Sequence, residues 1–160
     1  MLCSGLVDVN TCGERIGYRR TPLLCLSAER GHKDVVQILI DRGADPHKTN
    51  NSGKTPLLLA VLNGHHDVVQ LLLDNRADPY EGNSGGITPL HFAVIGGNRA
   101  VVKVLLERGV DPKYVNRSYR WTPLGWAKQR GDQDIVKMLL DGGAKCRCME
   151  AQCICDLTLT

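Results

Sequence analysis

The tripeptide Thr-Pro-Leu occurs four times at almost constant spacing, and this repetition constrains the fold more than any other feature. The copies begin at residues 21, 55, 88 and 122, so the spacings are 34, 33 and 34 residues. A glycine follows each copy, at residues 31, 64, 97 and 131, with nearly the same period. Periods of this size are typical of repeat proteins, in which each unit stacks on its neighbours. The chain is therefore predicted to be an array of four similar units.

Each unit is predicted to contain two short helices. Threonine favours the N-cap because its hydroxyl accepts a bond from a free amide of the first turn, and proline suits the first helical position. A glycine such as Gly64 ends this helix in the left-handed conformation. The first unit has one additional residue between Thr21 and Gly31, which predicts a shifted or distorted cap there. The second helix carries an aliphatic block such as residues 68–73 and, in three of the copies, an aspartate in its first turn. It ends at a glycine except in the second unit, where Arg76 takes that place at a cost of about 1 kcal/mol.

These motifs resemble the ankyrin repeat family. The family signature Thr-Pro-Leu-His-x-Ala is matched by residues 88–93, and the family's second-helix pattern resembles residues 64–78. The resemblance covers about residues 21–144. It implies an all-α fold, an ankyrin-repeat solenoid of paired antiparallel helices with β-hairpin-like fingers. It also implies a protein-protein interaction module or scaffold, which binds other proteins through the fingertips and the concave face of the first helices.

The pattern divides the chain into three parts. Residues 1–20 are expected to hold the end of a partial repeat, at 5–10, and an extended connection. Without a polar cap, the outer face of the first repeat would be exposed to solvent. Either the chain is part of a longer array, or its first segment folds back as a cap. The fragment interpretation is favoured. The remaining ranges are four repeats at about 21–53, 54–86, 87–120 and 121–144, and a flexible cysteine-containing tail at 145–160.

No catalytic, cofactor or metal site is predicted. His32, His65 and His66 lie at helix junctions, and His91 belongs to the cap motif, so all four are interpreted as structural. The glycine-rich stretch at 82–86 lacks the lysine and spacing of a phosphate loop. The tail contains two Cys-x-Cys pairs, at 146–148 and 153–155. Structural zinc sites usually have two to four residues between paired cysteines, so an unstructured reduced tail is favoured over a metal site.

The chain is predicted to be intracellular, either cytoplasmic or nuclear. Its seven cysteines are an odd number, and only Cys25 falls within the repeats, which argues against an oxidised scaffold. The N-terminus lacks the pattern of a secretory signal. The longest apolar run, at 57–62, is six residues, whereas about 20 are needed to cross a bilayer. No transmembrane segment is therefore expected.

The candidate binding surface lies on the fingers, named here finger 2 (47–54), finger 3 (80–87) and finger 4 (113–121). Finger 4 contains two tyrosines, one tryptophan and three basic residues in a chain with only 4% aromatics. Tyrosine, tryptophan and arginine dominate interface hot spots. The alternative is that Trp121 or Tyr119 fills a gap between repeats; Trp126 is expected in the core. The predicted protein-binding residues are Tyr80, Glu81, Asn83, Tyr114, Arg117, Tyr119, Arg120, Trp121, Lys128 and Arg130.

The basic charge is concentrated in one region. The chain carries a net charge of +3, but residues 99–130 hold eight Lys/Arg and two acids, which gives 8 − 2 = +6 locally. This region predicts a protein partner with an acidic surface, and no small-molecule substrate is evident. An alternative is contact with anionic phosphates of nucleic acid or a membrane, which is less favoured because Arg99 and Lys103 lie near a second helix. A further alternative is that the chain is the repeat segment of a larger enzyme.

Overall fold

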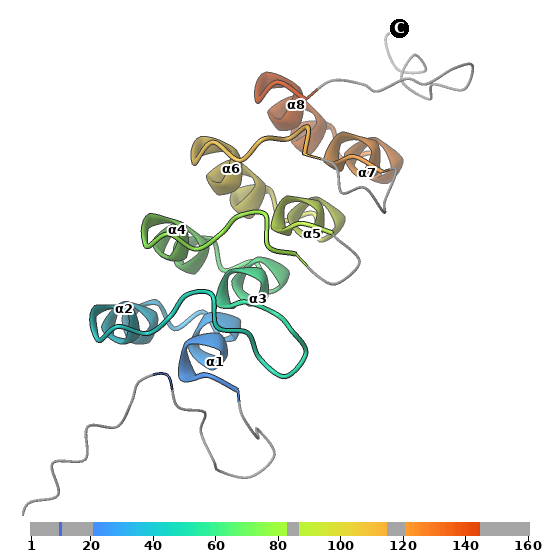
Figure 1. Ribbon diagram of the computed structural model, residues 1–160. Coiled ribbons are helices and arrows are strands. Elements are labelled where there is room, and N and C mark those ends of the chain that lie inside the picture. The colour runs from blue at the N-terminus through green and yellow to red at the C-terminus, as the bar shows by residue number, and fades with distance from the viewer. Residues whose placement is uncertain (1–9, 11–20, 83–86, 115–120, 145–160) are drawn as a thin grey trace, which may run out of the picture.

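The computed structural model describes residue 10 and residues 21–82, 87–114 and 121–144. In these ranges the chain forms eight α-helices in four successive pairs (Figure 1). The first helices of the pairs are Leu23–Glu29 (α1), Pro56–Leu62 (α3), Pro89–Ile95 (α5) and Pro123–Arg130 (α7). The second helices are Lys33–Asp41 (α2), His66–Asp74 (α4), Arg99–Glu107 (α6) and Gln133–Asp141 (α8).

The pairs are stacked along one direction, so the first helices form one row and the second helices form another (Figure 1). Each helix packs against the other member of its pair and against the equivalent helix of the next pair. Finger 2 projects from the side of the row of first helices (Figure 1). This arrangement is an all-α repeat solenoid, and the predicted fold class is confirmed.

Aliphatic side chains fill the space between the two rows. Leu57, Leu72, Leu90 and Leu105 are each at most 1% exposed, and they come from four different helices. Burying a leucine side chain of this size stabilises the fold by about 1.5–3 kcal/mol. Trp126, which was expected in the core, is only partly buried and packs against the core from its edge.

The predicted threonine caps form in two of the four first helices. The hydroxyl oxygen of Thr55 accepts a hydrogen bond from the amide of Leu58 at 3.1 Å, which caps α3. In α7, Thr122 accepts in the same way from the amide of Gly125 at 3.1 Å. Thr88 precedes α5 but makes no such bond, because its hydroxyl is hydrogen-bonded to the ring of His91 instead.

The first helix of the first unit begins one residue later relative to its Thr-Pro than the other first helices do, which confirms the predicted shift of its cap. Pro22 is the N-cap of α1, and Thr21 lies before the helix without capping it. The cause is the spacing: Gly31 stands ten positions after Thr21, whereas Gly64 stands nine positions after Thr55. Because the left-handed glycine fixes the end of the helix, the additional residue displaces its start.

The residues that end the helices have the predicted backbone conformations. Glycines after the first helices have φ between 68° and 76°, and those after three of the second helices have φ between 77° and 91°. Arg76 has φ 66°, and it is the one non-glycine residue with positive φ in the described ranges. The prediction that Arg76 is left-handed is confirmed. Aspartates also lie in the first turns of α2, α4 and α8, where a negative charge suits the helix dipole.

Candidate protein-binding surface

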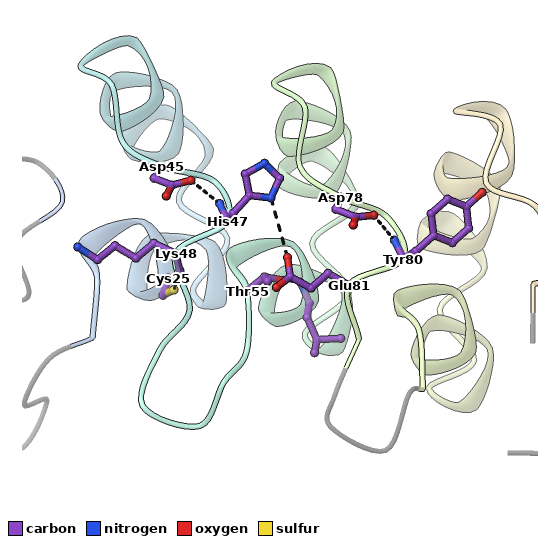
Figure 2. Close-up of polar contacts among 9 residues, drawn as sticks. Cys25, Asp45, His47, Lys48, Thr55, Asp78, Tyr80 and Glu81 are labelled. Carbon is purple, nitrogen blue, oxygen red and sulfur yellow. Dashed lines mark hydrogen bonds and ion pairs between the residues drawn. The ribbon is translucent and has the colours of Figure 1, made fainter. Parts of the chain in front are cut away.

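An aspartate turns the chain at the base of each finger. The carboxylate of Asp45 accepts a hydrogen bond from the amide of His47 at 2.9 Å, and Asp78 accepts from Tyr80 at 2.8 Å (Figure 2). Asp111 repeats the contact with Lys113 at 2.8 Å. An aspartate that bonds the backbone two residues ahead forms a turn without help from other residues. The Asp-Pro aspartates therefore shape the bases of the fingers.

Neighbouring fingers contact each other through the residues just after these turns. Nδ1 of His47 in finger 2 lies 3.9 Å from Oε2 of Glu81 in finger 3 (Figure 2). The rings of Tyr80 and Tyr114 lie 4.7 Å apart, between fingers 3 and 4, with their planes tilted by 41°. The hydroxyl oxygen of Tyr80 accepts a hydrogen bond from the amide of Asp111 at 3.0 Å. Tyr80 is thus fixed at both the ring and the hydroxyl by the next finger.

The other end of finger 4 is fixed by a buried histidine. His91 is 3% exposed, and its Nε2 donates to the carbonyl of Trp121 at 3.2 Å. Because a carbonyl only accepts, the other ring nitrogen is the acceptor for the Thr88 hydroxyl at 2.8 Å. Burial lowers the pKa of His91, although the bond to Trp121 opposes this shift. A neutral His91 therefore holds the backbone of Trp121 against α5.

Two aromatic pairs involve the two ends of finger 4, and each pair combines a partly buried ring with an exposed ring. Trp121 lies 5.0 Å from Trp126, ring centroid to ring centroid. Tyr80 and Trp126 are partly buried and pack against the core. Their partners Tyr114 and Trp121 are each 44% exposed. Each pair thus joins an inner aromatic ring, which packs, to an outer ring, which faces solvent.

The predicted site residues fall into three groups. Tyr80, Glu81, Tyr114 and Trp121 lie on fingers 3 and 4, and the structure brings Tyr80 and Tyr114 together. Lys128 and Arg130 lie in the last turn of α7, where positive charge suits the helix dipole. The guanidinium of Arg130 lies over Gly97. The third group lies outside the described residues and comprises Asn83, Arg117, Tyr119 and Arg120.

The basic region is less positive than its sequence count suggests. Arg99 contacts Asp134 at 2.7 Å and Asp132 at 3.2 Å, and Arg108 contacts Asp74. These three acids lie outside residues 99–130, so including them changes the local charge from +6 to 6 − 3 = +3. Lys103 also lies 3.8 Å from Glu107. The cations on the second helices therefore face acids of their own array.

Asp132 both contacts Arg99 and caps a helix. It is the N-cap of α8, and its carboxylate accepts a hydrogen bond from the amide of Ile135 at 3.3 Å. Desolvation raises the pKa of Asp132, but the bonds from Ile135 and Arg99 outweigh it and lower the pKa. The carboxylate is therefore charged at neutral pH, and it links α8 to Arg99 at the start of α6.

Cys25 occupies in the first unit the position that His91 occupies in the third when the units are aligned on the glycines that end their first helices. Counting back six residues from the left-handed glycine gives His91 in the third unit and Cys25 in the first. Cys25 is fully buried, and its Sγ lies 3.3 Å from the carbonyl of Lys48 (Figure 2) and 3.9 Å from that of Lys54. The thiol thus tethers finger 2 as His91 tethers finger 4. The constant distance to the glycine is the signal that identifies it.

Other chemical groups in the described ranges have structural surroundings. His65 Nε2 is hydrogen-bonded to the carbonyl of Glu29 at 3.0 Å, which joins α4 to the end of α1. Within residue 10, 21–82, 87–114 and 121–144, no cluster of three or more His, Cys, Asp or Glu side chains could hold a metal ion. The Cys-x-Cys pairs of the tail lie outside these ranges.

No helix in the part of the chain that the structure describes is long and apolar enough to span a bilayer. The longest of these helices has nine residues, whereas a span needs about 20.

Comparisons with known proteins agree with this architecture. The family described as ankyrin repeats (3 copies) matches residues 2–83 and 77–150. The human "Fibronectin type 3 and ankyrin repeat domains protein 1" is 48% identical over 42 residues, which are 26% of this chain and 12% of that protein. The "2-5A-dependent ribonuclease" of Mus musculus is 38% identical over 53 residues, which are 33% of this chain and 7% of that protein. The chain thus matches a small part of each relative. Ankyrin repeats indicate a protein-protein interaction module, and the chain belongs to the ankyrin repeat family.

Proposed function

We propose that the chain is a non-enzymatic protein-interaction module whose contact surface lies on fingers 3 and 4 and the last turn of α7. One observation carries the proposal: Tyr114 and Trp121 are each 44% exposed, and each lies against a partly buried aromatic ring that packs on the core. Exposed aromatic side chains supply large contact areas in protein interfaces. The two residues stand at the two ends of finger 4 in the sequence.

The contacts beneath these rings favour binding because they hold the surface in place before a partner arrives. Tyr80 is fixed by the amide of Asp111 at 3.0 Å, and the backbone of Trp121 is fixed by His91 at 3.2 Å. Ordering a side chain at an interface costs about 0.5–1.5 kcal/mol. A ring that is already held loses less freedom on binding, so more of its contact energy contributes to affinity.

We propose an acidic partner surface. Lys113 is exposed beside Tyr114 on finger 4, and Arg130 is exposed at the end of α7. The cations that face acids of the array, such as Arg99 and Arg108, lie on or just after the second helices. The proposed binding residues are the described Tyr80, Glu81, Tyr114, Trp121, Lys128 and Arg130, together with Asn83, Arg117, Tyr119 and Arg120 within the sequence ranges of fingers 3 and 4. We also propose an intracellular location, cytoplasmic or nuclear.

Affinity purification with mass spectrometry tests the surface. The bait proteins are the wild type, a Tyr114→Ala, Trp121→Ala double variant, and a Lys137→Ala control on the exposed side of α8. Partners recovered with both the wild type and the control should be lost from the double variant. Circular dichroism should show the same helix content in all three proteins.

Two outcomes would overturn the proposal. A partner set that is unchanged in the folded double variant would place binding elsewhere on the chain. Recovery of nucleic acid or lipid in place of protein, with affinity falling steeply as salt rises, would assign the surface to anionic phosphates.

A further inference from the structure

The second helix at one end of the array exposes side chains that its counterparts bury. Val35, four residues after the left-handed glycine, is 46% exposed in α2. The equivalent Val68 of α4, Val101 of α6 and Ile135 of α8 are at most 1% exposed. These three helices each follow another second helix in their row, whereas α2 lies at the end of the row (Figure 1). The position is therefore buried by a preceding second helix.

A second position repeats the contrast one turn later. Ile38 of α2 is 53% exposed, whereas the equivalent Leu71 and Val104 are each 9% exposed. On α1, Leu23 is also exposed, at 41%. The residue types at these positions in α2 remain aliphatic, as they are in the helices where a neighbour covers them. Val35 and Ile38 form a surface that is named here the α2 outer face. Its residue types are those of an interface between repeats.

Asn10 gives independent evidence of what this end of the array accommodates. Its carboxamide oxygen accepts a hydrogen bond from the amide of Asp45 at 2.8 Å. Tyr80 accepts from the amide of Asp111 at 3.0 Å in the same manner. Asn10 stands two residues after Asp8, as Tyr80 stands two residues after Asp78. Asn10 therefore contacts the base of finger 2 at Asp45, as Tyr80 contacts the base of finger 4 at Asp111.

Two further contacts hold Asn10 there. Its side-chain amide donates to the carbonyl of Gly43 at 3.3 Å, and its backbone carbonyl accepts from the Lys48 ammonium at 2.6 Å. The chain at Asn10 is therefore in register with the array before the first complete helix pair begins.

We propose that the α2 outer face is the docking surface for the helix pair of a preceding ankyrin repeat, joined to this array through Asn10. The occupant presents the aliphatic side of its second helix to Val35 and Ile38, as α4 and α6 do to their successors. A second copy of the chain fits less well. Among the described residues, only three large apolar ones are exposed at this end, and a separate copy would lose its translational and rotational freedom on docking there, whereas a covalently joined repeat would not.

Fusion of a designed ankyrin repeat in front of Gly5, in register with the array, tests the proposal. The docked repeat should raise the Tm of the protein by about 5 °C or more, because it buries the α2 outer face. The matched control is the same fusion with Val35→Lys and Ile38→Lys. In the control the gain should be lost, since two buried ammonium groups would oppose docking.

The same two lysines in the unfused chain separate the alternatives. There they should shift Tm by less than about 2 °C, because both positions face solvent. A large fall in Tm would mean that the chain's own residues already cover the face. A concentration-dependent dimer, measured by light scattering and abolished by the lysines, would identify a second copy as the occupant. Either result, or a fusion that gains nothing in Tm, would overturn the proposal.

Discussion

The second helices and the fingers recur with the same period, but only the second helices recur in residue type. Four residues after the glycine that ends each first helix, the second helix carries valine or isoleucine. A leucine follows four residues later. At the two ends of the fingers, by contrast, Lys48 and Lys54 of finger 2 correspond to Tyr114 and Trp121 of finger 4. Stacking imposes the same packing requirement on every inner helix, whereas a finger end faces solvent on one side. The repeated positions therefore hold the array together, and the divergent ones are available for recognition.

The largest expected effect comes from charging a repeated position. Val68→Lys places an ammonium group where the native side chain is 1% exposed between neighbouring repeats. We expect a loss of about 3 kcal/mol or more in the free energy of unfolding, measured by chemical denaturation. Gln70→Lys, on the exposed side of the same helix, should change stability by less than about 0.5 kcal/mol. Similar losses in both variants would show that α4 is not packed as described.

The next effect concerns His91, which links a helix to a finger. Because burial lowers the pKa of His91 below its ordinary value near 6.5, the unfolded chain takes up the proton first as the pH falls. The stabilisation by neutral His91 is therefore complete above about pH 6.5 and is lost as the pH falls towards the folded-state pKa. The limiting slope is about 1.4 kcal/mol per pH unit.

A His91→Leu variant isolates this contribution, because Leu58 occupies the equivalent position of α3 and is fully buried. Between pH 7 and pH 5, the wild type should lose more stability than the variant in urea denaturation. Parallel pH profiles of the two proteins would mean that His91 titrates normally in the folded state.

The smallest expected effect concerns Arg76, which follows a second helix at the position where the other units have a left-handed glycine. Arg76→Gly should raise the free energy of unfolding by up to about 1 kcal/mol, because glycine adopts φ near 66° without steric cost. Arg76→Ala is the control, since it removes the charge and keeps the β-carbon that causes the strain. Thermal melts should therefore show a gain for glycine alone. An equal gain for alanine would attribute the effect to the arginine side chain.

Local patterns predicted most of the fold. The helix pairs, the left-handed glycines and the conformation of Arg76 each depend on a few adjacent residues, so the sequence was sufficient to predict them. The shifted cap of α1 was also predicted, because the extra residue between Thr21 and Gly31 is visible in the sequence. The tether from Cys25 to finger 2 was not anticipated, because it depends on a contact between residues 23 positions apart.

The candidate surface was predicted less completely, because its geometry depends on contacts between repeats. Arg99 and Asp132 are 33 residues apart, and nothing in either unit alone indicates that they meet. The two aromatic pairs likewise join residues of different elements, and exposure distinguishes Tyr114 and Trp121 from the rings beneath them only in the folded array. Residue type identified the candidates, and packing decided which of them face solvent.

The most direct test of the proposed function is the dissociation constant of a purified partner for the wild type and for the Tyr114→Ala, Trp121→Ala double variant. Loss of hot-spot aromatics costs about 2 kcal/mol or more, so the double variant should bind at least about 30-fold more weakly, with its Tm lowered by no more than a few degrees. The Lys137→Ala control should keep the wild-type affinity. Equal dissociation constants for the wild type and a folded double variant would contradict the assignment of binding to this surface.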